Sequence, residues 1–143
     1  MSSFRYERPG SVAQATALLA EAPGRARVLA GGTDLMIALR SGAARVEMLV
    51  DVKRIPELSE IRWTPEGALL LGACVLVQDV AMDPRIRETF PALSEGALAI
   101  GSLQIRSRAT IGGNLANASP CMDTAPPLLI LNASIRAAGP RGD

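Results

Sequence analysis

The sequence contains no histidine among its 143 residues. This absence excludes a Ser-His-Asp hydrolase and a metalloprotease with the HExxH pattern. Only two cysteines are present, Cys74 and Cys121, and they lack the CxxC spacing typical of zinc or iron–sulfur sites. We therefore expect both to be reduced thiols, with Cys74 a small core residue.

The chain also has few aromatic residues and almost no net charge. Aromatic side chains make up 3% of the chain, so the core has to be built from Leu, Val, Ile and Ala, but the 48% of hydrophobic residues are enough to exclude disorder. The 15 basic and 14 acidic residues nearly cancel and form no basic run, so nucleic acid is not an expected partner. No apolar run approaches the ~18 residues of a membrane span, and the first residues lack the apolar region of a signal peptide. These features predict a cytoplasmic protein without membrane insertion.

Two glycine pairs are the most informative feature that is present. Gly31-Gly32 lies in the run VLAGGTDLMIAL and Gly112-Gly113 in the run ATIGGNLANASP, each after a short apolar stretch. Glycine tolerates φ > 0, so a Gly-Gly step can turn successive N–H groups inward to form an anion-binding concavity. A single pair after a strand is more often only a tight turn, and neither run matches GxGxxG or the P-loop pattern. Together, the two runs predict two backbone loops that close on one phosphate-bearing ligand.

The first third of the chain predicts a β-loop-helix-β unit. Ser11 and Gln14 form a capping box, which indicates a helix that runs to about Glu21. The next expected elements are a strand over 27–30, a helix over 34–40 that stops at Gly42, and a strand over 47–51. The first glycine loop thus precedes a helix, whose N-terminal dipole favours phosphate. Three residues are expected to form the buried face of this helix: Met36, Ile37 and Leu39.

A second lobe is expected to begin near Ile61. Residues 63–67 indicate a turn and 68–73 a buried strand, and Trp63 is expected to pack in the protein rather than to stack on a ligand. Asp83-Pro84 breaks the chain before a helix that starts near Leu93 and carries Ala97 and Ile100 on the same side. A further helix is expected over 124–131, with prolines tolerated in its first turn.

Both glycine runs and their neighbours resemble the FAD-binding medium subunit of molybdenum hydroxylases, the family of carbon monoxide dehydrogenase and xanthine dehydrogenase. The resemblance rests on 29–35, on Gln104-Ile105-Arg106 and on 110–120 closing on Asp123, and it extends from Phe4 to the last residue. It implies an α+β fold of the PCMH-type FAD-binding class, with a small βαβ lobe over 1–60 and the start of a second α+β lobe over 61–143. We expect the two glycine loops to face a cleft between these lobes. Such subunits are about twice this long, so the chain is expected to be an N-terminal half in which 134–137 open a further strand.

The same resemblance implies an oxidoreductase. In this family, FAD passes electrons from the iron–sulfur clusters of a 2Fe–2S small subunit to an acceptor such as NAD or a quinone. A large subunit carries the molybdenum cofactor and selects the substrate. Because the cofactor carries the chemistry, no catalytic acid or base and no metal ligand is expected on this chain. Two alternatives stay open, namely a stand-alone FAD oxidoreductase and a truncated, non-catalytic fragment that does not retain FAD.

The resemblance also assigns cofactor-binding residues. The first loop is expected to wrap the diphosphate and ribose through backbone N–H groups, and the second to contact the diphosphate from the other side. Asp123 matches a position that hydrogen-bonds toward the adenosine part. The expected cofactor-binding residues are Leu29, Ala30, Gly31, Gly32, Thr33, Asp34, Leu35, Thr110, Ile111, Gly112, Gly113, Asn114, Asn117 and Asp123.

Simpler roles stay open for several polar side chains near the loops. Asp34 and Asp123 are equally suited to capping the helices that follow them. Arg106 and Arg108 could attract phosphate, although arginines near a turn are more often simply solvated.

Overall fold

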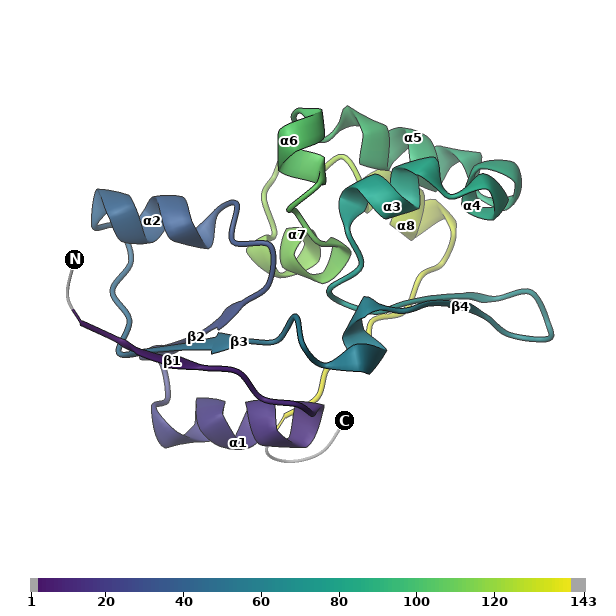
Figure 1. Ribbon diagram of the computed structural model, residues 1–143. Coiled ribbons are helices and arrows are strands. Elements are labelled where there is room, and N and C mark those ends of the chain that lie inside the picture. The colour runs from purple at the N-terminus through teal and green to yellow at the C-terminus, as the bar shows by residue number, and fades with distance from the viewer. Residues whose placement is uncertain (1–2, 140–143) are drawn as a thin grey trace.

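A computed structural model describes residues 3–139 of the protein (Figure 1). A small parallel sheet organises the N-terminal part of the chain, with strands in the order β1-β3-β2. Both strand pairs are parallel, and the register places Leu29 opposite Asp51, so β2 and β3 deliver the chain to the same edge of the sheet. Figure 1 shows the two connecting helices on opposite sides of this sheet. The elements are β1 (Arg5–Glu7), α1 (Val12–Glu21), β2 (Ala26–Leu29), α2 (Leu35–Ser41) and β3 (Met48–Asp51).

Helix α1 and the central strand form the first hydrophobic cluster. Ser11 caps α1 as predicted, since its side chain accepts a hydrogen bond from the Gln14 N–H at 3.2 Å, and Gln14 reaches back to the Gly10 N–H at 2.9 Å. The helix buries Ala15 and packs Val12, Leu18 and Leu19 against the cluster, and every residue of β3 is buried. Cys74 is a free, buried thiol in this cluster, as predicted, and burial raises its pKa. The buried members of the cluster are Ala15, Ala22, Ala26, Met48, Val50, Val52, Ile55 and Cys74.

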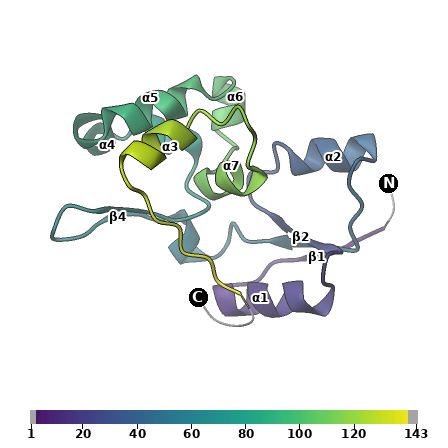
Figure 2. The same cartoon turned by 180° about the vertical axis from the view of Figure 1, so that it is seen from behind.

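Helix α2 differs from the sequence-based prediction. None of its residues is buried, and Ile37, expected on the buried face, is 65% exposed. The helix has only seven residues and ends at Gly42, where φ is 79°. Both views of the ribbon show α2 at the periphery, with no other helix over its outer side (Figures 1 and 2). The apolar residues of 36–39 do lie on a helix, but in the described part of the chain no other element covers the whole of their face.

The second part of the chain begins with a hairpin. Strands β4 (Ile61–Trp63) and β5 (Leu69–Leu71) pair antiparallel after the 3-10 helix η1 (Pro56–Ser59), and the turn ends at Gly67 with φ 88°. The prediction of a buried strand over 68–73 is wrong, because a two-stranded sheet packs only one face and Leu70 is 47% exposed. Trp63 packs as predicted, stacked on Phe90 with 5.7 Å between ring centroids.

A group of short helices completes the fold: α3 (Val77–Met82), α4 (Pro84–Thr89), α5 (Pro91–Ala99), α6 (Leu103–Arg106), α7 (Ile111–Asn117) and α8 (Ala125–Ile130). Asp83 separates α3 from α4 as predicted, and its carboxylate caps α4 by accepting from the Ile86 N–H at 2.9 Å. In α5, Leu93 and Ala97 are buried on one side. Helix α8 carries prolines in its first turn, as expected. The predicted strand at 134–137 is not formed, because these residues belong to no ladder in the described part of the chain.

Asp51 is a buried carboxylate at the end of β3. It is 3% exposed and accepts hydrogen bonds from the Tyr6 hydroxyl, from the Lys53 N–H at 3.1 Å and from Lys53 Nζ at 2.6 Å. Burial by itself raises the pKa of this carboxyl group, but the hydrogen bonds from Lys53 and Tyr6 and the Lys53 charge together hold it below its ordinary value. The cluster ties β1 to the edge of the sheet at which the first glycine loop begins.

We predict that Asp51→Asn lowers the free energy of unfolding at neutral pH by about 1.5–3 kcal/mol, the range for hydrogen bonds to a charged group. Because the folded-state pKa lies below the ordinary value of 3.8, this stabilisation is present above pH 3.8 and is lost as the pH falls through the lower, folded-state value. Urea unfolding at neutral pH and at successively lower pH measures it.

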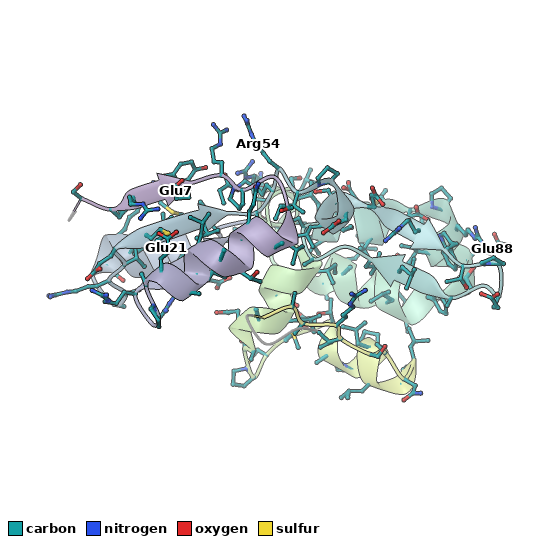
Figure 3. The ribbon with its side chains drawn as sticks, turned by 90° about the horizontal axis from the view of Figure 1, so that it is seen from below. Glu7, Glu21, Arg54 and Glu88 are labelled. Carbon is teal, nitrogen blue, oxygen red and sulfur yellow. The ribbon has the colours of Figure 1, made fainter. Side chains whose placement is uncertain are left out.

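A suitable control is Glu88→Gln. Glu88 is exposed on α4, and Figure 3 shows it far from Glu21 and from Glu7, which lies in the same sheet as Asp51. It should change the stability by no more than about 0.5 kcal/mol. The same difference between wild type and Asp51→Asn at every pH would contradict the assignment.

Candidate functional site

The first glycine run forms a loop between β2 and α2. Gly32 adopts φ 75°, a left-handed conformation that favours glycine. Two carbonyl groups of the loop are used, since Gly32 O accepts from the Met36 N–H at 3.1 Å and Asp34 O from the Ala38 N–H at 3.0 Å. By contrast, none of the backbone N–H groups of residues 31–35 meets an acceptor within residues 3–139. The loop therefore presents a run of free donors.

The second glycine run is not the loop that the sequence predicted. Gly112 and Gly113 lie in the first turn of α7, and neither has a positive φ. All of the first donors of α7 are used: Ile111 N–H donates to Val75 O at 3.0 Å, Gly112 N–H to Ala73 O at 2.9 Å, Gly113 N–H to Thr110 Oγ1 at 3.1 Å and Asn114 N–H to Thr110 O at 2.9 Å. The first turn of α7 therefore has no free backbone N–H group to offer a ligand.

Close packing explains the glycine at position 112. A Cβ atom there would lie 2.5 Å from the Cβ atom of Ala73 and 2.7 Å from its carbonyl oxygen, closer than non-bonded atoms approach. At Gly113, a Cβ atom would come within 2.7 Å of Thr110 Oγ1. Glycine is thus required so that α7 can lie on the segment after β5, rather than for a left-handed turn.

The two glycine runs nevertheless meet. A Cβ atom on Gly31 would lie 2.2 Å from the carbonyl oxygen of Arg108 and 3.0 Å from Cα of Ala109. The first loop is therefore in direct backbone contact with the residues that lead into α7. The two runs are therefore adjacent through main-chain contact, and their closure on one phosphate-bearing ligand stays a prediction.

Three polar side chains from the predicted set lie on α7 and just after it. Asn114 Oδ1 accepts a hydrogen bond from Thr124 Oγ1 at 2.6 Å, and its Nδ2 has no partner within the described residues. Asn117 is exposed at the end of α7. Asp123 is also exposed, and its carboxylate accepts no hydrogen bond from residues 3–139. Neither Asp34 nor Asp123 caps the helix that follows, so the simpler role considered for them is not observed.

The apolar residues of the predicted set have structural surroundings. Ile111 is 5% exposed and packs in a second hydrophobic cluster, which also contains Val77, Val80 and Leu93 of the helical part. Ala30 packs against the first hydrophobic cluster, the one formed by α1 and β3. Leu29 and Leu35 are half-buried at the two ends of the first loop.

The two arginines considered as phosphate ligands differ. Arg106 is occupied, since its Nε donates to Gln78 Oε1 at 3.0 Å and its NH1 donates to the carbonyl oxygens of Leu98 and Ile100, each at 3.0 Å. It closes the C-terminal end of α5. Arg108 is exposed, has no side-chain partner within the described residues, and touches Gly31 through its own carbonyl group. Arg108 is therefore an exposed arginine whose backbone adjoins the loop with the free donors.

A shallow hollow lies elsewhere, between β1 and α1, and is lined by Glu7, Arg8, Gln14 and Glu21 among others. Figure 3 shows Glu7 and Glu21 together on this side of the molecule. Arg5 links them through ion pairs of 2.9 and 3.0 Å. The glycine runs do not line this hollow. Within residues 3–139 there is no group of three His, Cys, Asp or Glu side chains placed to hold a metal ion, and no helix long and apolar enough to cross a membrane.

The sequence matches the family described as FAD binding domain in molybdopterin dehydrogenase over residues 2–143. The chain belongs to this family. It is 36% identical over 137 residues to the xanthine dehydrogenase FAD-binding subunit of Escherichia coli O157:H7, which covers 96% of the chain and 47% of that subunit. It is also 36% identical over 140 residues to the carbon monoxide dehydrogenase medium chain of Hydrogenophaga pseudoflava, covering 97% and 48%.

Solved structures agree with this family. The Cu,Mo-CO dehydrogenase matches with a TM-score of 0.92 at 36% identity, over 99% of this chain and 49% of the other. Reconstituted CO dehydrogenase from Oligotropha carboxidovorans matches with a TM-score of 0.93 at 35% identity and the same coverage. These matches confirm the predicted α+β, PCMH-type fold, and family membership confirms FAD as the cofactor. The chain spans about half the length of the relatives it matches. The division of the chain into lobes over 1–60 and 61–143 remains a prediction. Residues 1–2 of the first lobe and 140–143 of the second lie outside the described part of the chain.

The residues present fit a dinucleotide. The free N–H groups of 31–35 and the Arg108 guanidinium suit a diphosphate, and the exposed Asp123 carboxylate suits a hydroxyl or amino donor. Thr124 is the polar residue at the site that the sequence did not single out. A hydroxyl residue before a proline-rich helix start is typical of an N-cap. The sequence therefore suggested a capping role for Thr124 and gave no sign of its hydrogen bond to Asn114.

We predict that Gly31→Ala lowers the free energy of unfolding by about 1–3 kcal/mol, the usual cost of forcing extra atoms into a packed contact. The added methyl group would have to displace the backbone of Arg108, 2.2 Å away. Urea unfolding measures the loss. Gly10→Ala is the matched control, since its nearest neighbour would be a flexible side-chain oxygen at 3.7 Å. Equal stability of Gly31→Ala and wild type would contradict the contact.

Proposed function

We propose that the chain forms the diphosphate-binding part of an FAD-containing, electron-transferring subunit in a molybdenum hydroxylase complex. The observation that carries the proposal is the run of free backbone donors at 31–35, held against the entry to α7 in a chain of this family. FAD, when bound, supplies the capacity to store electrons and release them again.

In this proposal the first loop holds the diphosphate. Backbone N–H groups of 31–35 donate to its oxygens, and the exposed Arg108 guanidinium adds positive charge beside them. Asp34 lies at the far end of the loop, where its carboxylate accepts a hydrogen bond from the Thr33 hydroxyl at 3.2 Å and has room to accept another from a ribose hydroxyl.

The second glycine run contributes differently. The N–H groups of 111–114 are used, so the run supports the first loop through the Gly31 contact and offers the free Asn114 amide as a side-chain donor. Asp123 accepts hydrogen bonds from the adenosine part. Asn117, exposed on the last turn of α7, completes the proposed set.

The proposed partners follow from the relatives. Their names describe subunits of xanthine and carbon monoxide dehydrogenases, and in such a complex this subunit would receive electrons from an iron–sulfur subunit and serve a molybdenum-containing one. An acceptor such as NAD or a quinone would take the electrons onward. The oxidoreductase activity belongs to the whole complex, and its substrate would be selected on the molybdenum subunit.

We predict that Gly32→Ala, in the complete gene product that carries residues 1–143, sharply reduces FAD retention. Gly42→Ala is a matched control, because Gly32 and Gly42 flank α2 with φ of 75° and 79°. Each substitution should cost about 1–2 kcal/mol of stability for a left-handed residue with a Cβ atom. Only Gly32 belongs to the donor loop, so only Gly32→Ala should lower the flavin content, measured by absorbance after gel filtration. Equal flavin content in the two variants would refute the proposed diphosphate site.

A second prediction concerns the 143-residue chain by itself. The donors of the first loop engage the polar diphosphate, whereas burial of the flavin ring contributes ~25 cal/mol for each Å² of apolar surface removed from water. We place most ring contacts in the half of the relatives that this chain does not span. The isolated chain should therefore bind FAD with a Kd weaker than about 1 μM, a free energy of about −8 kcal/mol. Submicromolar binding in a fluorescence titration would show that this half is sufficient.

A further inference from the structure

Thr124 has a buried hydroxyl group that does not serve its own helix. The residue is 1% exposed and occupies the N-cap position of α8. At such a position, a threonine side chain usually accepts a hydrogen bond from an N–H group of the first turn. Here it makes no capping bond and instead donates to Asn114 Oδ1, ten residues earlier on α7, at 2.6 Å.

This hydrogen bond fixes the orientation of the Asn114 amide. A separation of 2.6 Å is usual for an O–H···O hydrogen bond and short for N–H···O, so the oxygen end of the amide faces Thr124. The amide group is planar, so its Nδ2 end must then point away from Thr124. No buried side-chain nitrogen or oxygen lacks a partner in the described residues, so Nδ2, which has none there, is accessible to solvent.

The free amide end lies on the helix that adjoins the first glycine loop. Helix α7 begins directly after Arg108 and Ala109, the backbone of which Gly31 touches. Figure 2 shows α7 lying between α2 and α8, and the Thr124–Asn114 hydrogen bond joins α7 to the start of α8. The first backbone donors of α7 are all used, so the helix offers a ligand the side-chain amides of Asn114 and Asn117, of which Asn114 lies nearer its N-terminus.

We infer that Thr124 is a positioning residue of the FAD site, which acts by holding the Asn114 amide with its N–H groups toward the diphosphate. This inference rests on the proposed function. Without the Thr124 hydroxyl, the amide is free to turn its oxygen toward the ligand, and an oxygen acceptor facing a diphosphate is repelled. The buried hydroxyl thereby determines whether the second glycine run attracts the ligand.

The test compares variants of the complete gene product by fluorescence titration of the apo-protein with FAD. Thr124→Val preserves the shape of the side chain and removes the hydroxyl, so the Kd should rise about three- to tenfold, as expected for one hydrogen bond. Thr124→Ser keeps the hydroxyl and should restore a Kd close to that of wild type. If Thr124→Val does not fold, Thr124→Ala replaces it, because Ala and Ser both lack the methyl group and differ only in the hydroxyl.

A double-mutant cycle separates positioning from general stability. In an Asn114→Ala background, Thr124→Val should raise the Kd no further, because the group through which it acts is gone. The matched control is Ser94→Ala, which removes another buried hydroxyl that donates to Ala81 O at 2.8 Å in the helical core. That variant should lower the melting temperature and leave the Kd for FAD unchanged.

The outcomes distinguish the two proposals. If wild type binds FAD and Thr124→Val binds it equally well, the inference is wrong and the proposed function stands. Additive effects of Thr124→Val and Asn114→Ala, or a Ser94→Ala variant that also weakens FAD binding, would equally overturn the positioning role. If wild type itself does not bind FAD, the proposed function fails and the inference fails with it.

Discussion

The backbone contact at Gly31 is the constraint on which the arrangement of the site depends. The absence of a side chain there lets the first loop rest directly on the carbonyl group of Arg108. Similar close contacts occur at Gly72, which lies against the backbone of Leu58, and at Gly112, which lies against Ala73. We call Gly31, Gly72 and Gly112 the glycine seam, because each lets main chain from one part of the fold touch main chain or a small side chain from another. The seam brings the sheet edge, the hairpin and α7 together, and the donors of 31–35 owe their place to it.

The site divides its tasks unevenly between the two glycine runs. The first run leaves the N–H groups of 31–35 free, whereas the second uses those of 111–114, two in bonds to Val75 O and Ala73 O and two in bonds to Thr110. The Gly-Gly pair therefore serves a different purpose in each of the two runs. Gly32 supplies a left-handed conformation, whereas Gly31 and Gly112 supply space. The buried Asp51 cluster adds rigidity at the base of the first loop, since Asp51 lies opposite Leu29 where the strands end.

Elements with a local signal were predictable from the sequence. The Ser11 cap, the Asp83-Pro84 break and the stop at Gly42 all act within one turn of the residue concerned, and the structure has each of them. The predictions that were wrong depended on distant partners. The spacing of Met36, Ile37 and Leu39 indicates a helix with an apolar face, but it does not say whether another element covers that face.

The candidate site follows the same division. The glycine runs were recognisable because they are a property of the sequence itself, and the resemblance to the family predicted that both bind one ligand. The helical state of Gly112 and Gly113 was not, because the free energy that favours it comes from hydrogen bonds to Ala73 and to the Thr110 side chain. Thr124 escaped notice for a related reason, since its partner lies on a different helix.

The glycine seam has an evolutionary consequence. Folding alone requires its glycines, so selection for a stable chain would preserve them even in a descendant that no longer carried a cofactor. The Asn114–Thr124 pair is under a weaker obligation, because the Nδ2 end of the Asn114 amide makes no hydrogen bond within residues 3–139 that the fold would need. Among diverged descendants, the glycine seam would therefore record common ancestry, while the Asn114–Thr124 pair would record whether the ancestral ligand is still bound.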